Sequence, residues 1–141
     1  MQLTKLKHWN EQRNANANRI IETLAPYRSV RVSAPPADIT HAYYRLYAFV
    51  VPEHLAEGWD RDRIMQEVNA AGIPCFSGSC PEIYNEKAFD EDDLRPREPM
   101  SNAKLLGPTS LAFLVHPTLT SRDIDRTCDR LNDILSRTTL A

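Results

Sequence analysis

The segment HAYYRLYAFVVP, residues 41–52, constrains the fold of this chain more than any other stretch. It is rich in aromatic and β-branched residues, which favour extended backbone, and it predicts the main strand. Three shorter segments are also predicted to be extended: SVRVSAPP at 29–36, IPCF at 73–76 and SLAFLVHP at 110–117. The chain therefore builds a small sheet from short strands.

Helical segments separate these strands. Residues 3–24 are predicted to form a long helix that Pro26 ends. The residues that recur at steps of three and four along it are Leu6, Trp9, Arg13, Ala17, Ile20 and Leu24. The middle of this helix reads NANAN, which forms helix poorly and has little to bury. We therefore expect the helix to be exposed mid-length, or to lean on a body outside this chain.

Two further amphipathic helices follow. Asp60 is the predicted N-cap of the first, and Gly72 is its predicted C-terminal glycine. Ser121 is the predicted cap of the last helix, with Asp123 in the first turn, where a negative charge suits the helix dipole. The apolar stripes that these helices bury are predicted to be Ile64, Met65, Val68 and Ala71, and Ile124, Cys128, Leu131 and Leu135.

The remaining residues complete the order of elements. Residues 82–89 are predicted to form a short helical turn, 90–99 a charged surface loop and 100–107 a short helix. The resulting order, α-β-β-α-β-α-β-α, predicts an α+β fold: a small, mainly antiparallel sheet with helices packed on one face. A chain of 141 residues fits one domain, with a long helix over 1–25 and an α+β body over 26–141.

Composition excludes several classes of function. The formal net charge is −2 and the 17 basic residues are spread along the chain, so no basic face for nucleic acid is predicted. The longest apolar stretch falls far short of the ~20 residues that a membrane helix needs. The first residues lack the features of a secretion signal. Three cysteines, an odd and sparse number, indicate free thiols and predict a cytoplasmic protein.

The segment GIPCFSGSCPEIY, residues 72–84, is the candidate for chemistry. As a metal site it would use Cys75, Cys80 and His116, but zinc sites show tighter paired spacings and four ligands. As a nucleophile elbow it would need G-x-S-x-G, whereas FSGSC places its serines around a glycine. The four glycines of the chain form no phosphate-binding loop. We therefore predict neither a catalytic nucleophile nor a metal site.

A loop of small residues remains. Ser77, Gly78 and Ser79 offer hydroxyl groups and bare backbone for close approach to a ligand, and Gly78 is expected to permit a turn. Pro74 and Pro81 flank this loop and stiffen its ends. A plain connector is an equal alternative on the local residues alone.

Taken together, five segments in this order resemble the C-terminal part of the DegT/DnrJ/EryC1/StrS aminotransferases. They are NEQRNANANRIIETLAP, HAYYRLYAFVVP, RDRIMQEVNAAGIP, CPEIY and LGPTSLAFLVHPTLTSRDIDRTCDRLNDIL. The resemblance runs from about Trp9 to Leu135. Members of this family are pyridoxal-phosphate enzymes of fold type I that act mostly on nucleotide-linked keto sugars.

The resemblance implies that the catalytic residues and the cofactor site belong to another domain. In the family, the lysine that binds the cofactor and the carboxylate that pairs with its pyridine nitrogen both lie in a larger N-terminal domain. The chain therefore resembles the small domain alone, with no catalytic or cofactor-binding residue of its own. The implied partners are that large domain, a second subunit in a homodimer and a sugar-nucleotide substrate.

The substrate-binding candidates are Ser77, Gly78, Ser79 and Tyr84. Many family members carry a His-Tyr pair two residues before the loop proline, where this chain has Gly78 and Ser79. The alternative function is a free-standing α+β binding or interaction module without catalysis.

Overall fold

A computed structural model describes residues 3–78, 80–90 and 95–140 of the chain. The helices and strands are α1 (Leu6–Leu24), β1 (Val30–Val32), β2 (Leu46–Val50), α2 (Arg61–Ala70), β3 (Cys75–Phe76), α3 (Ser101–Leu106), β4 (Ser110–Phe113) and α4 (Ser121–Thr138). Short 3-10 helices are η1 (Leu3–Lys5), η2 (Pro52–His54), η3 (Ile83–Asn85), η4 (Lys87–Phe89) and η5 (Gly107–Thr109). The predicted order of elements is confirmed.

The strands form an antiparallel sheet in the order β1-β2-β4-β3. The α+β class is thereby confirmed, but the main strand is shorter than predicted, because extended pairing begins only at Leu46. Tyr43 explains the late start: its φ of 41° lies in the left-handed region, which an extended strand cannot include. Its backbone N–H donates to His41 Nδ1 at 3.0 Å and closes a tight turn.

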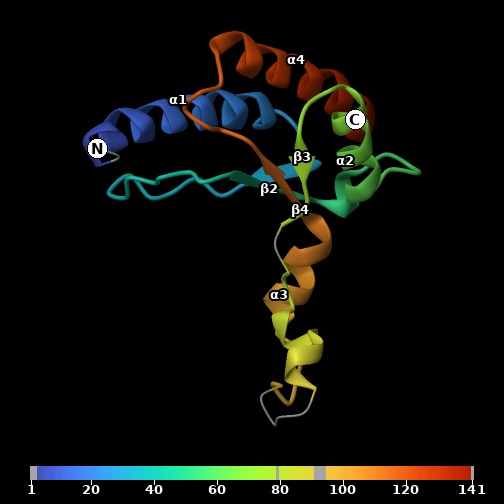
Figure 1. Cartoon of the computed structure of the whole chain (residues 1–141). Coiled ribbons are helices and arrows are strands. Elements are labelled where there is room, and N and C mark those ends of the chain that lie inside the picture. The colour runs from blue at the N-terminus through green and yellow to red at the C-terminus, as the bar shows by residue number, and fades with distance from the viewer. Residues whose placement is uncertain (1–2, 79, 91–94, 141) are drawn as a thin grey trace.

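One face of the sheet carries the core. Leu46, Ala48 and Val50 of β2 are buried, and so are Leu111 and Phe113, with which Ala48 and Leu46 pair on β4. Figure 1 shows α1 and α4 on this side of the sheet, and α2 contacts β3 and β4. Each fully buried aliphatic or aromatic side chain of this kind contributes roughly 1.5–3 kcal/mol. The predicted packing of helices on one face is therefore observed, while α3 lies on the opposite side.

The asparagine-rich middle of α1 differs from the expectation. Asn16 and Ala17 are buried rather than exposed, and the Asn16 amide donates to the His116 backbone oxygen at 3.2 Å, just beyond β4. The Asn14 amide donates to the His41 backbone oxygen at 2.7 Å. These residues form helix poorly, but they bind two backbone carbonyls that lie far away in the sequence. The exposed part of α1 is its start, where Leu6 is 45% exposed.

The caps of two helices were partly predicted. Asp60 accepts from the Arg63 backbone N–H at 2.7 Å, and Gly72 has a φ of 78°, so both predictions for α2 are confirmed. For α4 the predicted cap is wrong, because Thr120 rather than Ser121 is the N-cap. The Asp123 N–H donates to Thr120 Oγ1 at 3.2 Å, and the Thr120 N–H donates to Asp123 Oδ2 at 2.8 Å. Hydrogen bonds from Thr120 lower the pKa of Asp123.

The described residues between β3 and β4, which are 77–78, 80–90 and 95–109, leave the sheet and return to it, and we call them the arm. It contains η3, η4, α3 and η5, and none of these helices has a buried residue. Figure 1 shows the arm projecting from the sheet on the side opposite to α1 and α4. No helix among the described residues is long and apolar enough to cross a membrane.

The capping box generates the first prediction. Replacing Thr120 with alanine removes both the acceptor for the Asp123 N–H and a donor to its carboxylate, so we expect a loss of about 1 kcal/mol of unfolding free energy. Ser121→Ala is the matched control, because Ser121 is exposed one residue further on, and it should stay within about 0.5 kcal/mol of the parent. Urea denaturation of the three proteins measures both effects. Equal losses for the two variants would contradict the assignment of the cap.

Candidate functional site

The base of the arm is held by the hydroxyl group of Ser110. The backbone N–H of Gly78 donates to Ser110 Oγ at 2.9 Å, and Ser110 Oγ donates to the Gly107 carbonyl oxygen at 3.2 Å. Arg61 of α2 adds a contact of 3.4 Å to the Ser110 carbonyl oxygen. Since the Ser110 side chain is nearly fully buried, this one hydroxyl joins the outgoing and returning ends of the arm to β4.

Two glycines let the ends of the arm approach this closely. A Cβ atom on Gly78 would lie 2.8 Å from Ser110 Oγ, and one on Gly107 would lie 2.4 Å from Pro81 Cγ. Gly78 does not have a positive φ, so no left-handed backbone conformation requires glycine there. It is needed because a larger residue could not pass Ser110. The loop after β3 is therefore fixed in position by packing.

The predicted substrate-binding residues lie at different places on the arm. Ser77 is exposed beside Gly78 at the base, and Ser79 lies outside the described residues. Tyr84 is half-buried in η3; its hydroxyl donates to Glu82 at 2.5 Å and accepts from the Met100 N–H at 3.1 Å. The hydrogen bond to Glu82 raises the pKa of Tyr84. The structure thus places Ser77 next to the sheet and Tyr84 within the arm.

The sheet face opposite the core forms a wall next to this loop, and we call it the open face. Two cross-strand rows make it up: Phe76, Ala112 and Tyr47, and Ser110, Phe49 and Arg31. The guanidinium carbon of Arg31 lies 4.7 Å from the centre of the Phe49 ring, and that of Arg45 lies 4.6 Å from the Phe76 ring. At these distances each guanidinium group is attracted to the face of an aromatic ring.

Sequence reasoning missed this surface, although a signal for it exists. Arg45, Tyr47 and Phe49 alternate with the buried Leu46, Ala48 and Val50. The period of two predicts that both sets lie on opposite faces of one strand. The aromatic residues Tyr47 and Phe49 thus lie together on the face opposite the core. Ser110 was missed because nothing local distinguishes it from any other serine at a strand start.

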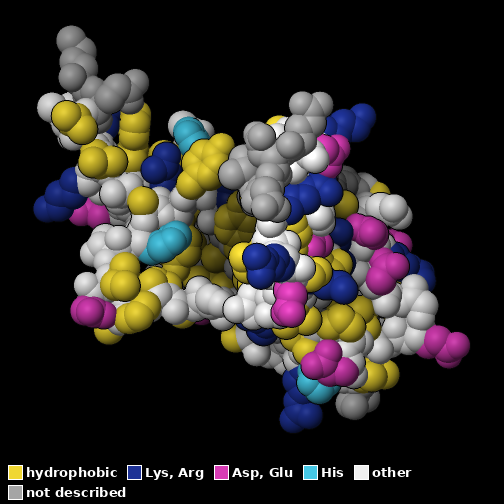
Figure 2. All heavy atoms as spheres, turned by 90° about the horizontal axis from the view of Figure 1, so that it is seen from below, with side chains coloured by type: hydrophobic (Ala, Val, Ile, Leu, Met, Phe, Trp, Pro, Cys, Tyr) yellow, Lys and Arg dark blue, Asp and Glu magenta, His cyan; other side chains and the backbone are white. Residues whose placement is uncertain are grey.

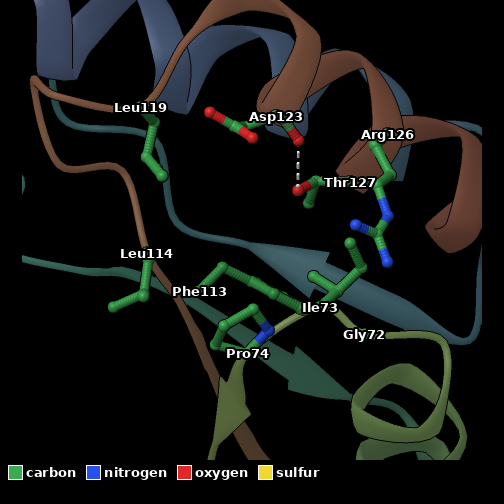
Figure 3. A pocket seen from close by; sticks show the side chains of 9 residues that line it. All are labelled: Gly72, Ile73, Pro74, Phe113, Leu114, Leu119, Asp123, Arg126 and Thr127. Atoms are coloured by element: carbon green, nitrogen blue, oxygen red, sulfur yellow. Dashed lines mark hydrogen bonds between the residues drawn. The ribbon is translucent and has the colours of Figure 1, made fainter.

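A separate cavity of about 110 Å³ lies on the core side, between the end of α2 and the start of α4 (Figure 3). Its lining is Gly72, Ile73, Pro74, Phe113, Leu114, Leu119, Asp123, Arg126 and Thr127. The polar groups at its rim serve local structure: the Thr127 hydroxyl donates to the Asp123 carbonyl oxygen at 2.8 Å, and Arg126 donates to the Ala71 carbonyl oxygen at 3.2 Å. The remaining lining is mostly apolar.

The residues considered for a metal site or a nucleophile lie in different surroundings. Cys75 is buried in β3, and burial raises the pKa of its thiol to about 12, so it stays protonated near neutral pH. His116 is exposed, with Nδ1 2.8 Å from the Thr118 hydroxyl oxygen, which is a local turn contact. Within the described residues, no group of three or more His, Cys, Asp or Glu side chains could hold a metal ion.

These features define an α+β domain in which a loop is fixed in position beside one face of the sheet. Residues 1–132 match the DegT/DnrJ/EryC1/StrS aminotransferase family. The chain belongs to that family, which confirms the resemblance seen in the sequence.

Solved structures agree with this assignment. The chain is 41% identical to an aminotransferase from Psychrobacter cryohalolentis, with a TM-score of 0.89, over 96% of this chain and 36% of that one. A DegT DnrJ EryC1 StrS aminotransferase from Brucella abortus shares 22% identity and a TM-score of 0.74, over 93% and 32%. The E coli GDP-4-keto-6-deoxy-D-mannose-3-dehydratase with bound hydrated PLP shares 19% identity and a TM-score of 0.75, over 92% and 32%. The chain thus spans about a third of the length of these proteins.

The base of the arm generates the second prediction. Gly78→Ala places a methyl group against Ser110 Oγ, so we expect a loss of about 1–3 kcal/mol of unfolding free energy. Ser110→Ala loses two hydrogen bonds and should cost about 1–3 kcal/mol. The double variant should lose less than the sum, because removing the hydroxyl group relieves the clash. Urea denaturation of all four proteins measures the coupling, and additivity within about 0.5 kcal/mol would contradict the contact.

Proposed function

We propose that this chain is the small domain of a pyridoxal-phosphate-dependent aminotransferase that acts on a nucleotide-linked keto sugar, and that it forms one wall of the substrate cleft. One observation carries the proposal: the fold aligns over 96% of this chain with an aminotransferase of which it covers only 36%. This coverage supports the assignment of the chain to one part of a larger enzyme. The residues that we assign to the cleft are Ser77, Gly78, Ser79 and Tyr84.

The lysines of this chain do not lie in surroundings suited to tethering pyridoxal phosphate. Pyridoxal phosphate is tethered through a lysine amine. The lysines of this chain are Lys5, Lys7, Lys87 and Lys104, and all four side chains are exposed on helices at the surface. None of them lines the cavity in Figure 3. We therefore assign the cofactor-binding lysine to the other two-thirds of the enzyme.

The proposed contribution of this chain to the cleft is to hold the Ser77 hydroxyl group in a fixed position. The Gly78 backbone is fixed against Ser110, and Pro74 and Pro81 restrict the backbone on either side. The exposed Ser77 hydroxyl is therefore held at a defined place next to the open face. A hydroxyl that is already ordered loses little entropy when a sugar hydroxyl or phosphate binds to it. A homodimer is the proposed assembly of the complete enzyme.

The exposed lysines generate the third prediction. When the isolated chain is incubated with pyridoxal phosphate, no stoichiometric long-wavelength absorbance of a lysine-bound cofactor should appear, because all four lysine side chains are exposed. Titration by absorbance spectroscopy, followed by borohydride reduction and mass spectrometry, measures the modification. Slow, partial labelling spread over several lysines is the expected background. A one-to-one adduct that disappears when a single lysine is replaced would overturn the assignment.

The Ser77 hydroxyl generates the fourth prediction. In the complete enzyme, Ser77→Ala should lower kcat/KM by the worth of one hydrogen bond, about 0.5–1.5 kcal/mol or roughly a 2- to 13-fold loss. The melting temperature should stay unchanged, because Ser77 is exposed. Ser121→Ala, an exposed serine on α4, is the kinetic control and should leave kcat/KM unchanged. Unchanged kinetics together with a destabilised domain would show that Ser77 is structural.

A further inference from the structure

We propose that the cavity between α2 and α4 is a binding site for a short apolar monocarboxylate, which places its carbon chain in the cavity and its carboxylate group on Arg126. The cavity lies between the end of α2 and the start of α4, on the side of the sheet opposite to the arm (Figure 3). The inference does not depend on the proposed function, because it rests on a different part of the chain.

The volume and lining of the cavity determine the size of the carbon chain. The buried side chains of Ile73 and Phe113 form its floor, and the half-buried Leu114 and Leu119 lie along one side (Figure 3). Protein interiors leave few voids larger than a water molecule, so an apolar cavity of this size is a feature that needs an occupant. An apolar cavity of about 150 Å³ stays dry and takes up benzene, and one of about 110 Å³ therefore suits a smaller group of about four carbons.

Arg126 determines where the carboxylate group binds, because its side chain is held at one end of the cavity. One of its N–H groups donates to the Ala71 carbonyl oxygen at 3.2 Å, at the C-cap of α2. The guanidinium group also takes the space that a side chain on Gly72 would need, since a Cβ atom there would lie 2.4 Å from Arg126 Nη2. A guanidinium group has five N–H donors, and the bond to Ala71 is the one it makes among the described residues. Donors therefore remain for a carboxylate group, which arginine can bind through two parallel hydrogen bonds.

The charges at the cavity favour an anion. Asp123 is the one carboxylate in the described lining, and Figure 3 shows it at the opposite end of the cavity from the Arg126 guanidinium group. Its Oδ2 accepts from the Thr120 N–H at 2.8 Å and from the Thr120 hydroxyl group at 2.6 Å, so the capping box already engages this negative charge. Arg126 is the one cation in the same lining. A ligand with a single carboxylate group complements that end of the cavity.

The surface on the side of the arm differs from this cavity. Figure 2 shows that side, where hydrophobic side chains reach the surface among basic and acidic side chains. The cavity instead combines a concave apolar lining with one arginine at its end. That combination selects a small molecule with an apolar body and one acidic group.

Titration of the chain with isovalerate near neutral pH, followed by the amide signals in NMR spectra, tests the site. Saturable shifts are expected at residues 72–73, 113–114 and 123–127. Isovaleramide has the same shape without the charge, and acetate has the charge without the apolar body, so each should bind at least about tenfold more weakly. Equal affinities for isovalerate and isovaleramide would overturn the proposal. Shifts that do not saturate, or that lie outside the cavity, would also overturn it.

Two arginine variants test the position of the carboxylate group. Arg126→Gln should bring the affinities for isovalerate and isovaleramide to within about twofold of each other, because the charge that distinguishes the two probes is gone. Arg122→Gln is the matched control, since Arg122 is exposed four residues earlier on α4 and does not line the cavity. It should keep the preference for isovalerate. An Arg126→Gln chain that also kept the full preference would show that the carboxylate group binds elsewhere and would overturn the proposal.

A variant that fills the cavity tests the position of the carbon chain and leaves Arg126 in place. Leu119→Phe adds volume where Leu119 faces the cavity (Figure 3), and it should weaken isovalerate binding at least about tenfold. Leu105→Phe, at a residue of the arm that is 65% exposed, is the control and should leave binding unchanged. Undiminished binding to Leu119→Phe would overturn the proposal, and this test decides it even where Arg126→Gln does not fold.

Discussion

Burial of one face of the sheet beneath α1, α2 and α4 is the interaction on which the rest of this structure depends. The strands are only two to five residues long, so pairing between strands could not hold them without the packed side chains of Leu46, Leu111 and Phe113. Because side chains alternate along a strand, packing one face also fixes what the other face presents. The aromatic residues and arginines of the open face are placed by the core beneath them.

The same constraint positions the candidate site. Ser110 pairs with Phe49 on the open face, at the first residue of β4, and its hydroxyl reaches both ends of the arm. A one-residue shift in the register of β4 would move this hydroxyl to the core and release the Ser77 loop. The helices on one side of the sheet thus determine the position of a loop on the other. A free-standing binding module is an alternative use of this surface, since the partly exposed Tyr47 and Phe76 and an arm whose helices bury no residue suit any large partner.

Hydrophobic periodicity and residue preferences in the sequence predicted those parts of the fold that depend on neighbouring residues alone. The α+β class, the order of elements, the Asp60 cap and the glycine that ends α2 all follow from periodicity and from residue preferences within a few positions. Tertiary contacts determined what was missed. The asparagines of α1 bind carbonyl groups near His41 and His116, and Tyr43 ends the extended run early in a turn with His41. Thr120 and Ser121 are adjacent and both are residue types that cap helices, and the backbone geometry of the turn makes Thr120 the N-cap of α4. The loop of the candidate site was found from its small residues, whereas Ser110, 32 residues further along, appears only in the fold.

The measurement that tests the central claim most directly is the coding sequence that precedes the first codon of this chain. The account predicts an in-frame large domain there, with a lysine to tether pyridoxal phosphate and a carboxylate to pair with its pyridine nitrogen. Mass spectrometry of the native protein should then find one polypeptide that contains both parts. An in-frame stop codon directly upstream, together with a native protein of the length studied here, would contradict the account and would favour a free-standing interaction module.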